Sequence, residues 1–525
     1  MTGERSFSVP LTIVLGLLVL VSMLVSMPAF PATYTVDPTG NDGGAGDSAN
    51  PWRTVQHAAG VVVPGDIVAI NAGTYTESVY LNHSGVADAP IVFSASPGAV
   101  LVSPNPSASL SAFDIAMGTG FVELAGIEAT GGFDETIFLR SGTHDITISG
   151  CNLHGNRAGI IMGGASNITV DHCSLHDNLI LGIRFAAGTH DVQVSDTDSF
   201  RNGNPTSPVC SSSVDGFAAE PDTHALTFTR VRSYQNTGDG FDLQADAVTL
   251  NDVTSSGNAC TGIKLYQNVT VRGCLVFANA RGVAVTSVAG GSLADIAQCT
   301  VAANTGLALD LTKAKIPDVT YAVSLRNSIL VSPGKGVQYV KAAVLSEDHN
   351  IFFRPGLYDG GVIAQVGGYR FSDHDINVGR WTQLSQQGQG TIAVDPQFVD
   401  PASGNFQVAP TSDAVGRGAP IDGASVSLNI GLYQQPAGPT NNSPWADAGR
   451  DLRGRVFRKF NVNATGSFDP DGDPLSYSWD FGDGSAPTLG FTATHIYLAP
   501  GRYAVTLTVS DGTLASQATI HATVH

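Results

Sequence analysis

Between Val214 and Leu265, three aspartates and one lysine stand at equivalent positions of a repeated sequence pattern. Three short segments in this stretch each contain a glycine followed by an apolar residue, namely Gly216–Phe217, Gly240–Phe241 and Gly262–Ile263. The glycines lie 24 and then 22 residues apart, a spacing that is typical of a structural repeat. Asp215 and Asp239 directly precede their glycines, whereas Asp242 and Lys264 stand two residues after theirs. If each segment is one turn of a solenoid, the three carboxylates and the amine form one patch.

Such a patch could cleave a uronic-acid polymer by β-elimination, in which a base removes the proton alpha to the sugar carboxylate. A Ca²⁺ ion on that carboxylate would neutralise it and stabilise the enolate-like transition state. Calcium prefers several oxygen ligands, which Asp215, Asp239 and Asp242 offer. Lys264 is the candidate base; Asp242 would raise the pKa of its amine and a nearby cation would lower it. Arg184 is the candidate that holds a substrate carboxylate.

The elements that must position these residues are predicted by a recurring asparagine. It stands at Asn156, Asn178, Asn202, Asn236, Asn258, Asn279 and Asn304. Most of the differences are 21 to 25 residues, which predicts a parallel β-helix whose equivalent positions stack about 4.8 Å apart. Buried asparagine amides would then bond from coil to coil as a ladder.

Five residues before each asparagine stands a small or apolar residue, as inward stacking requires. Four of these positions are cysteines, Cys151, Cys173, Cys274 and Cys299. We expect them to be stacked core thiols, not disulfides or metal ligands. The histidines, among them His144, His154, His172, His176, His190 and His224, are likewise expected to be structural.

The residues that follow the repeat glycines predict an in–out–in strand in each coil. The middle, outward positions are Ile161, Arg184, Asp242, Lys264 and Ala284. Ionisable groups therefore occupy the middle of this outward row. One interval, from Asn202 to Asn236, is 34 residues long, so about ten extra residues enter directly before Asp215 and could form a wall of a groove.

Composition agrees with a long β-structure. The chain has 525 residues, of which 60 are glycine and only 14% are charged. Its net charge of −19 argues against a nucleic-acid partner. A divalent cation would let such an acidic protein hold an acidic polysaccharide.

The chain is predicted to be all-β, with a β-helix followed by a small sandwich. Residues 1–32 read as an export signal or an N-terminal membrane anchor, which places the remainder outside the cytoplasm as a secreted or cell-surface monomer. Residues 33–435 form the β-helix domain, with a capping segment at about 33–105. Residues 436–444 are a linker, and 445–525 form the sandwich. In an oxidising compartment, Cys210 and Cys260 could pair.

The C-terminal segment resembles the PKD domain family. The matching residues are Trp479-Asp-Phe-Gly-Asp-Gly-Ser485, Pro500-Gly501, Tyr503 and the run that ends at Asp511. The resemblance implies an Ig-like, non-catalytic extracellular module. Asp469, Asp471 and Asp473 lie close together and either form a solvated acidic turn, which we favour, or bind Ca²⁺.

The coil region resembles polysaccharide lyase family nine, the β-helical pectate lyases. The matching pieces are Asp215–Ala219, Gly238–Leu243 and Gly262–Leu265. The resemblance implies a right-handed β-helix in which Asp215, Asp239 and Asp242 bind calcium and Lys264 abstracts the proton. The sequence departs from the family at Gly238, where an aspartate is usual, and at Glu220, where a lysine is common.

Three functions remain open at this stage. The first is a calcium-dependent lyase for a uronic-acid polymer such as pectate. The second is a glycosidase or epimerase on the same fold. The third is a non-enzymatic surface or adhesion protein, for which a β-helix joined to a PKD-like module is equally suited.

Overall fold

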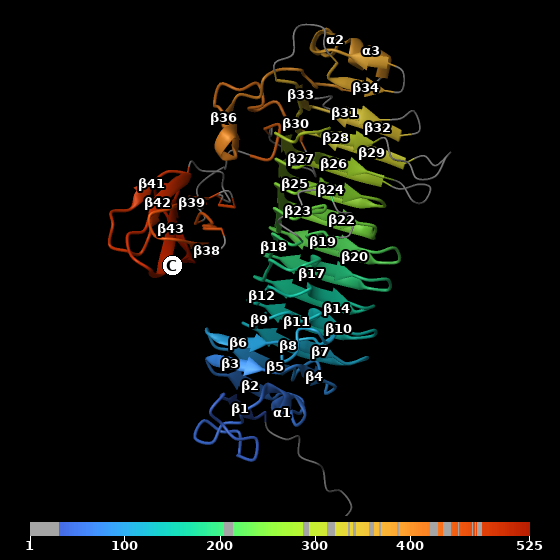
Figure 1. Ribbon diagram of the computed structural model, residues 1–525. Helices are drawn as coiled ribbons and strands as arrows, with labels where there is room; N and C mark the ends of the chain where they lie inside the picture. Colours follow the sequence, from blue (N-terminus) through green and yellow to red (C-terminus); the bar gives the residue numbers. More distant parts are fainter. Residues whose placement is uncertain are drawn as a thin grey trace, which may run out of the picture.

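The chain folds into a long β-solenoid with a small β-sandwich beside it, as the computed structural model shows (Figure 1). It describes residues 31–525 except 204–209, 211–213, 287–292, 312–320, 334–336, 340–342, 356–361, 367–368, 386–387, 421–428, 434–442, 450, 465, 468 and 470–474. The region predicted to be an export signal or anchor therefore lies outside the described residues, apart from its last two. Among the residues that are described, no helix is both long and apolar enough to cross a membrane.

Each coil contributes strands to two parallel sheets. Along the larger sheet, one run of stacked strands comprises β1 (Thr33–Val36), β2 (Ile67–Ile70), β5 (Ile91–Ala95), β8 (Gly120–Ala125), β11 (His144–Ser149), β14 (Ser166–Asp171), β17 (His190–Ser195), β20 (His224–Thr229), β23 (Asp246–Ser256), β25 (Val269–Phe277), β27 (Leu293–Ala302), β29 (Tyr321–Arg326) and β32 (Ala343–Asp348). A second run in that sheet comprises β3 (Gly73–Thr76), β6 (Ala99–Val102), β9 (Glu128–Thr130), β12 (Asn152–His154), β15 (Ser174–His176), β18 (Asp198–Phe200), β21 (Arg232–Tyr234), β30 (Ile329–Val331) and β33 (Ile351–Phe353), and the long strands β23, β25 and β27 span both runs.

The second sheet carries the outward row predicted to be functional. It comprises β4 (Val79–Leu81), β7 (Phe113–Ile115), β10 (Glu135–Leu139), β13 (Ala158–Met162), β16 (Leu181–Phe185), β19 (Phe217–Ala219), β22 (Phe241–Leu243), β24 (Thr261–Leu265), β26 (Arg281–Val285), β28 (Leu309–Leu311), β31 (Val337–Tyr339) and β34 (Ala364–Val366), with β35 (Tyr369–Phe371) antiparallel at its end. The predicted parallel β-helix is confirmed.

The asparagine ladder is also confirmed. From Asn156 to Asn279, the backbone N–H of each asparagine donates to the side-chain oxygen of the next, at 2.9–3.2 Å. All seven asparagines are buried. Because every rung satisfies a buried polar group of its neighbour, the ladder fixes the register of the coils.

The solenoid is closed at both ends by short helices (Figure 1). Helix α1 (Val55–Ala59) begins after Thr54, whose side chain caps it, within the segment expected to be the cap. Strands β1–β6 already form coils in that same segment. At the far end lie α2 (Asp373–Asn377) and α3 (Arg380–Ser385), followed by β36 (Phe398–Asp400), the 3-10 helix η1 (Pro401–Ser403) and β37 (Asn405–Val408).

The cysteine predictions are corrected in part. Cys151 and Cys173 are buried free thiols, as expected. Cys274 and Cys299, however, are joined by a disulfide. They are register partners on β25 and β27, with Cα atoms 4.5 Å apart, and stacking in adjacent coils is what brings them within bonding reach.

The C-terminal module is the predicted sandwich. One sheet contains β38 (Leu452–Gly454), β40 (Ser476–Asp480), β41 (Thr488–Leu489), β43 (Gly501–Ser510) and β44 (Ala515–Val524), and the other pairs β39 (Lys459–Asn463) with β42 (Thr492–Ile496). Trp479 is fully buried in its core. Asp469 is buried, which contradicts the solvated turn favoured from the sequence, whereas Asp471 and Asp473 lie outside the described residues.

Candidate active site

Strands β19, β22 and β24 lie side by side and set the register of the predicted site. Phe217 pairs with Phe241, and Phe241 with Ile263, and all three side chains are buried in the solenoid core. The residue after each points outward, so Asp242 and Lys264 are direct neighbours in adjacent coils. The sequence-based alignment of these two side chains is therefore confirmed.

The other two aspartates hold the coils together at the turn before each strand. Oδ1 of Asp215 accepts a hydrogen bond from the backbone N–H of Asp239 at 2.7 Å. Oδ1 of Asp239 accepts one from the N–H of Thr261 at 2.6 Å. Each carboxylate is thus fixed by the following coil, and both are buried.

The amine of Lys264 joins two of the three acids. Its Nζ lies 2.7 Å from Oδ2 of Asp242 and 3.3 Å from Oδ2 of Asp239, and 21% of the side chain is exposed. Burial lowers the pKa of the Lys264 amine, but Asp242 and Asp239 raise it by more, so the net pKa is raised. In this arrangement the amine is protonated at neutral pH.

The carboxyl groups are held in a poorly solvated environment. Burial and the neighbouring Asp239 raise the pKa of Asp215 to about 8. Burial also raises the pKa of Asp242. Asp242 was expected to face solvent, but it is only 6% exposed, since the strands and Lys264 cover it. Three carboxyl groups thus lie around one ammonium group, that of Lys264.

The donor chemistry of the patch suits a calcium ion. All three aspartates supply hard oxygen ligands, and Oδ1 of Asp242 is buried without a hydrogen-bond partner among the described residues. The side-chain positions are not those of a closed cage. In the described part of the chain, only Asp171, His172 and Asp196 bring three atoms able to bind a metal, two carboxylate oxygens and a ring nitrogen, within 4.8 Å of one another.

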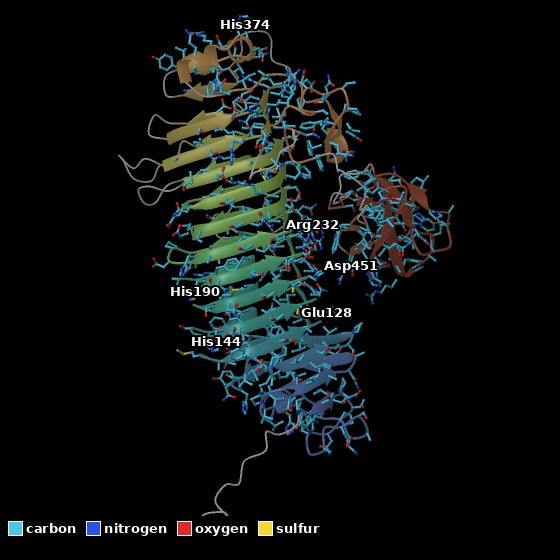
Figure 2. The ribbon with its side chains drawn as sticks, turned by 180° about the vertical axis from the view of Figure 1, so that it is seen from behind. Glu128, His144, His190, Arg232, His374 and Asp451 are labelled. Atoms are coloured by element: carbon cyan, nitrogen blue, oxygen red, sulfur yellow. A yellow bond between two sulfur atoms is a disulfide. The ribbon has the colours of Figure 1, made fainter. Side chains whose placement is uncertain are left out.

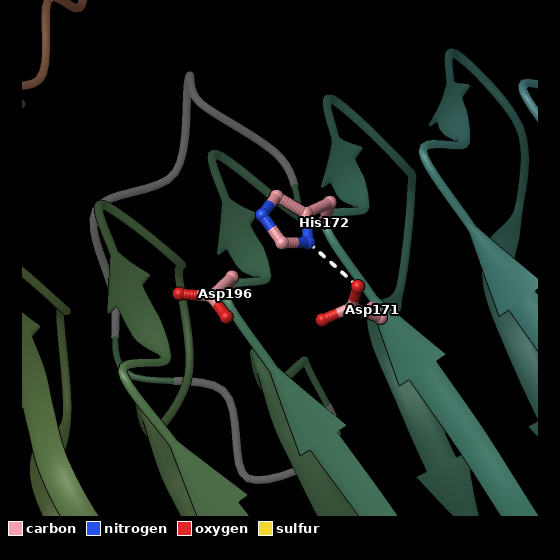
Figure 3. Close-up of side chains that lie close together, drawn as sticks. All are labelled: Asp171, His172 and Asp196. Carbon is pink, nitrogen blue, oxygen red and sulfur yellow. Dashed lines mark hydrogen bonds and ion pairs between the residues drawn. The ribbon is translucent and has the colours of Figure 1, made fainter.

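That second cluster lies at a turn of the larger sheet (Figure 3). Nδ1 of His172 lies 2.6 Å from Oδ2 of Asp171. Both oxygens of Asp196 accept hydrogen bonds from the Arg230 guanidinium, at 2.7 and 2.6 Å. The Arg230 guanidinium therefore already binds both oxygens of Asp196, which a metal ion at this cluster would need as ligands. The other histidines expected to be structural include two stacked pairs, His154–His176 and His190–His224, each with ring centroids 4.9 Å apart.

Arg184 lies on the predicted outward row but at a distance from Lys264. The register runs from Arg184 through Ala218 and Asp242 to Lys264, which is three coil steps, or about 14 Å at the usual strand spacing. Nε of Arg184 donates to Oε1 of Glu220 at 2.8 Å. The Arg184 side chain is about half exposed, so it is accessible from the surface beside the cluster, at a distance from Lys264.

Gly238 has no room for the aspartate that the family resemblance implies. A Cβ atom there would lie 2.0 Å from the carbonyl oxygen of Val214 and 2.5 Å from Oδ1 of Asp215. The close approach of two coils at this point therefore requires glycine. The site is built around three aspartates because the backbone excludes a fourth.

Tyr266 belongs to the site and was missed by the sequence analysis. Its ring centroid lies 5.5 Å from Nζ of Lys264, and the side chain is buried. Burial and Asp242 raise the pKa of its hydroxyl to about 12, which keeps it neutral. The sequence contained one indication of this role: Tyr266 stands two residues after Lys264, and alternate residues of a strand point to the same side.

A disulfide joins the insertion, the extra residues that precede Asp215 in the longest interval of the repeat, to the site. Cys210 and Cys260 are bonded, which confirms the predicted pairing. Cys260 directly precedes β24, the strand of Lys264. The bond therefore attaches the insertion, whose other residues between 204 and 213 lie outside the described set, to the coil that carries the amine.

Comparison with known proteins agrees with this architecture. A family model described as Pel9A-like, right handed beta helix region matches residues 34–305, and a PKD domain model matches residues 441–525. The solved structure of pectate lyase Pel9A covers 79% of this chain and 98% of its own, with 18% identity and a TM-score of 0.44. An alginate lyase from Paenibacillus sp. str. FPU-7 covers 61% and 99%, with 15% identity and a TM-score of 0.34.

A curated relative shares a much shorter segment. The microbial collagenase of Vibrio alginolyticus is 34% identical over 94 residues, which is 17% of this chain and 11% of the collagenase. The match thus spans about a tenth of that protein.

Proposed function

Because the chain belongs to the Pel9A-like, right-handed β-helix family, we propose that it is a calcium-dependent lyase that cleaves a uronic-acid polymer by β-elimination. The observation that carries this proposal is the position of the Lys264 amine, 2.7 Å from Asp242 and 3.3 Å from Asp239 on an outward row. The two acids hold the partly exposed amine in place, and a cation bound beside it would lower its pKa and allow the neutral amine to act as the base.

Lys264 is the base in this proposal. Its Nζ, once neutral, takes the proton from the carbon adjacent to the sugar carboxylate. The electron pair left behind forms a carbon–carbon double bond as the glycosidic C–O bond breaks, and the departing oxygen takes up a proton. Asp242 and Asp239 orient the amine through the two contacts described above, and the neutral Tyr266 hydroxyl packs beside it.

Asp215, Asp239 and Asp242 would hold Ca²⁺ together with carboxylate oxygens of the substrate. When bound, the ion would neutralise the substrate carboxylate and make the adjacent C–H more acidic. The buried Oδ1 of Asp242, which has no hydrogen-bond partner among the described residues, supports a cation at this patch, because an ion would supply the missing contact. Arg184 would hold a carboxylate further along the polymer.

The charge of the whole chain fits the same assignment. A net charge of −19 repels a polyanion unless divalent cations lie between them. A polysaccharide of this kind is met outside the cell, so we assign the protein to the secreted or cell-surface fraction.

The test is to incubate the protein with polygalacturonate and Ca²⁺ and to follow the ultraviolet absorbance of unsaturated chain ends. The signal should appear, and EDTA should abolish it. Lys264→Ala is the negative control. Release of reducing ends without the chromophore would indicate a glycosidase, and a changed uronate composition at constant chain length would indicate an epimerase. Binding without any product would leave an adhesion role.

A further inference from the structure

A cavity of about 510 Å³ lies where the solenoid, its closing segment and the C-terminal sandwich meet. Its walls come from β21, β23 and β25 of the solenoid, from residues 399–405, and from residues 466–491 of the sandwich as far as these are described. Its volume falls in the range of about 300–1,000 Å³ that is usual for small-ligand sites. It lies on the larger sheet, whereas Lys264 lies on the other sheet.

Five aromatic side chains line this cavity; besides the buried Tyr234, they are Phe277, Tyr433, Tyr477 and Phe491. These last four side chains are only partly buried, so part of each remains uncovered. Three of them are held by ring contacts: Phe277 packs against Phe406 with centroids 5.1 Å apart, and Tyr477 and Phe491 meet edge-on at 5.4 Å. These three rings are thus held at set positions around the space.

Arg232 fixes the sandwich against the solenoid at the side of the cavity (Figure 2). Its Nη1 donates to the carbonyl oxygen of Gly466 at 2.9 Å, and its guanidinium lies 4.5 Å from the ring centroid of Trp445. Nε of the same side chain donates to Oδ1 of Asp198 at 2.7 Å. The two domains are therefore joined by a buried, bonded side chain, and the walls are held in position.

The charges of the residues that line the cavity favour an uncharged ligand over an anionic one. Asp400 and Asp469 contribute carboxylates, whereas the positive charge of Arg232 is balanced by Asp198. The net negative wall repels a uronate. Aromatic faces combined with hydrogen-bond acceptors suit a molecule with apolar C–H faces and a rim of hydroxyl groups.

We propose that this interdomain cavity is a binding site for a neutral sugar segment, separate from the site on the other sheet. An uncharged pyranose can stack its C–H face on the Tyr477 and Phe277 rings and donate hydroxyl hydrogen bonds to the two carboxylates. The protein would then hold neutral glycan through this site while the lysine-containing site takes the acidic polymer. The binding does not depend on the lyase assignment.

The experiment is isothermal titration calorimetry of the full chain in EDTA with cello-oligosaccharides, galacto-oligosaccharides and oligogalacturonate. At least one neutral series should bind and oligogalacturonate should not. Tyr477→Ala should weaken binding about tenfold, whereas Tyr477→Phe should keep it, because the ring provides the contact. Tyr369→Ala, which removes an exposed aromatic outside the cavity, is the matched control.

Ala402→Trp provides a second test that leaves the packed core untouched, since Ala402 is exposed and lines the cavity. It should abolish binding while the melting temperature stays that of the parent chain. Binding that survives Ala402→Trp, a preference for oligogalacturonate, or no binding by either neutral series would each overturn the proposal.

Discussion

Nζ of Lys264 lies 2.7 Å from Oδ2 of Asp242, its register partner in the adjacent coil. The contact joins residues 22 positions apart in sequence, and it exists because the coils stack in register. It also determines the state of the amine, since the acid beside it raises the pKa of Lys264.

Lys264→Ala should lower kcat on polygalacturonate by about 10²- to 10⁴-fold, the usual contribution of a general base. Substrate binding should change little, because the aspartates remain. Initial rates from the absorbance of unsaturated ends measure the effect. Lys459→Ala, at an exposed lysine of the sandwich, is the control and should retain full activity. Equal losses in the two variants would remove the catalytic role of Lys264.

Asp242→Asn should weaken calcium activation, because it removes the carboxylate whose buried Oδ1 has no hydrogen-bond partner in the described part of the chain. The calcium concentration for half-maximal rate should rise at least about tenfold, equivalent to about 1.4 kcal/mol. Calcium should also raise the melting temperature of the parent chain and do so less in this variant. Asp114→Asn provides the control, since Asp114 lies on the same outward row beside Arg140. An unchanged calcium dependence in Asp242→Asn would place the ion elsewhere.

Activity should rise with pH through the alkaline range, because the raised pKa of Lys264 leaves little neutral amine at pH 7. A cation beside the amine lowers that pKa, so higher calcium should move the profile to lower pH. Rates measured from pH 7 to 11 at two calcium concentrations test this. A profile that does not move with calcium would separate the ion from the base.

Asp215→Asn should stabilise the calcium-free protein at high pH. The pKa of Asp215 is raised from 3.8 to about 8 in the fold, so the folded state binds more protons than the unfolded state between these values, and stability falls as pH rises through this window. The amide keeps the acceptor for the Asp239 N–H and removes the charge. We expect a gain of roughly 1–3 kcal/mol at pH 8.5 and little at pH 4, measured by denaturant unfolding in EDTA. The same gain at both pH values would contradict the assignment.

Glu220→Gln should lower KM for long polygalacturonate by releasing the Arg184 guanidinium from its acid partner. Arg184→Ala should raise KM several-fold and leave kcat within about twofold, since Arg184 lies three coil steps from Lys264. Kinetics on long and short substrates separate the two effects. A large fall in kcat for Arg184→Ala would instead place this residue at the reacting centre.

The features that the sequence predicted well are those that repeat. The asparagine spacing gave the coil register, and the glycine spacing placed Asp242 beside Lys264 because both depend on the same periodicity. The pairing of Arg184 with Glu220 was not foreseen, since it depends on rotamers across two coils. The Cys274–Cys299 bond was missed for a related reason: stacking alone does not determine whether two thiols remain apart. Gly238 departs from the family pattern, and the physical reason, the close approach of Val214 and Asp215 from the preceding coil, depends on the three-dimensional fold.

The asparagine ladder has a practical consequence for altering this protein. Its rungs join coils that differ in length by up to 13 residues, and the bond between Asn202 and Asn236 across the longest interval is 3.0 Å, like the others. The number of residues between successive ladder asparagines can therefore vary without changing how the coils stack. Peptides inserted between Asn202 and Asp215 should therefore change the substrate specificity while the melting temperature of the solenoid stays the same.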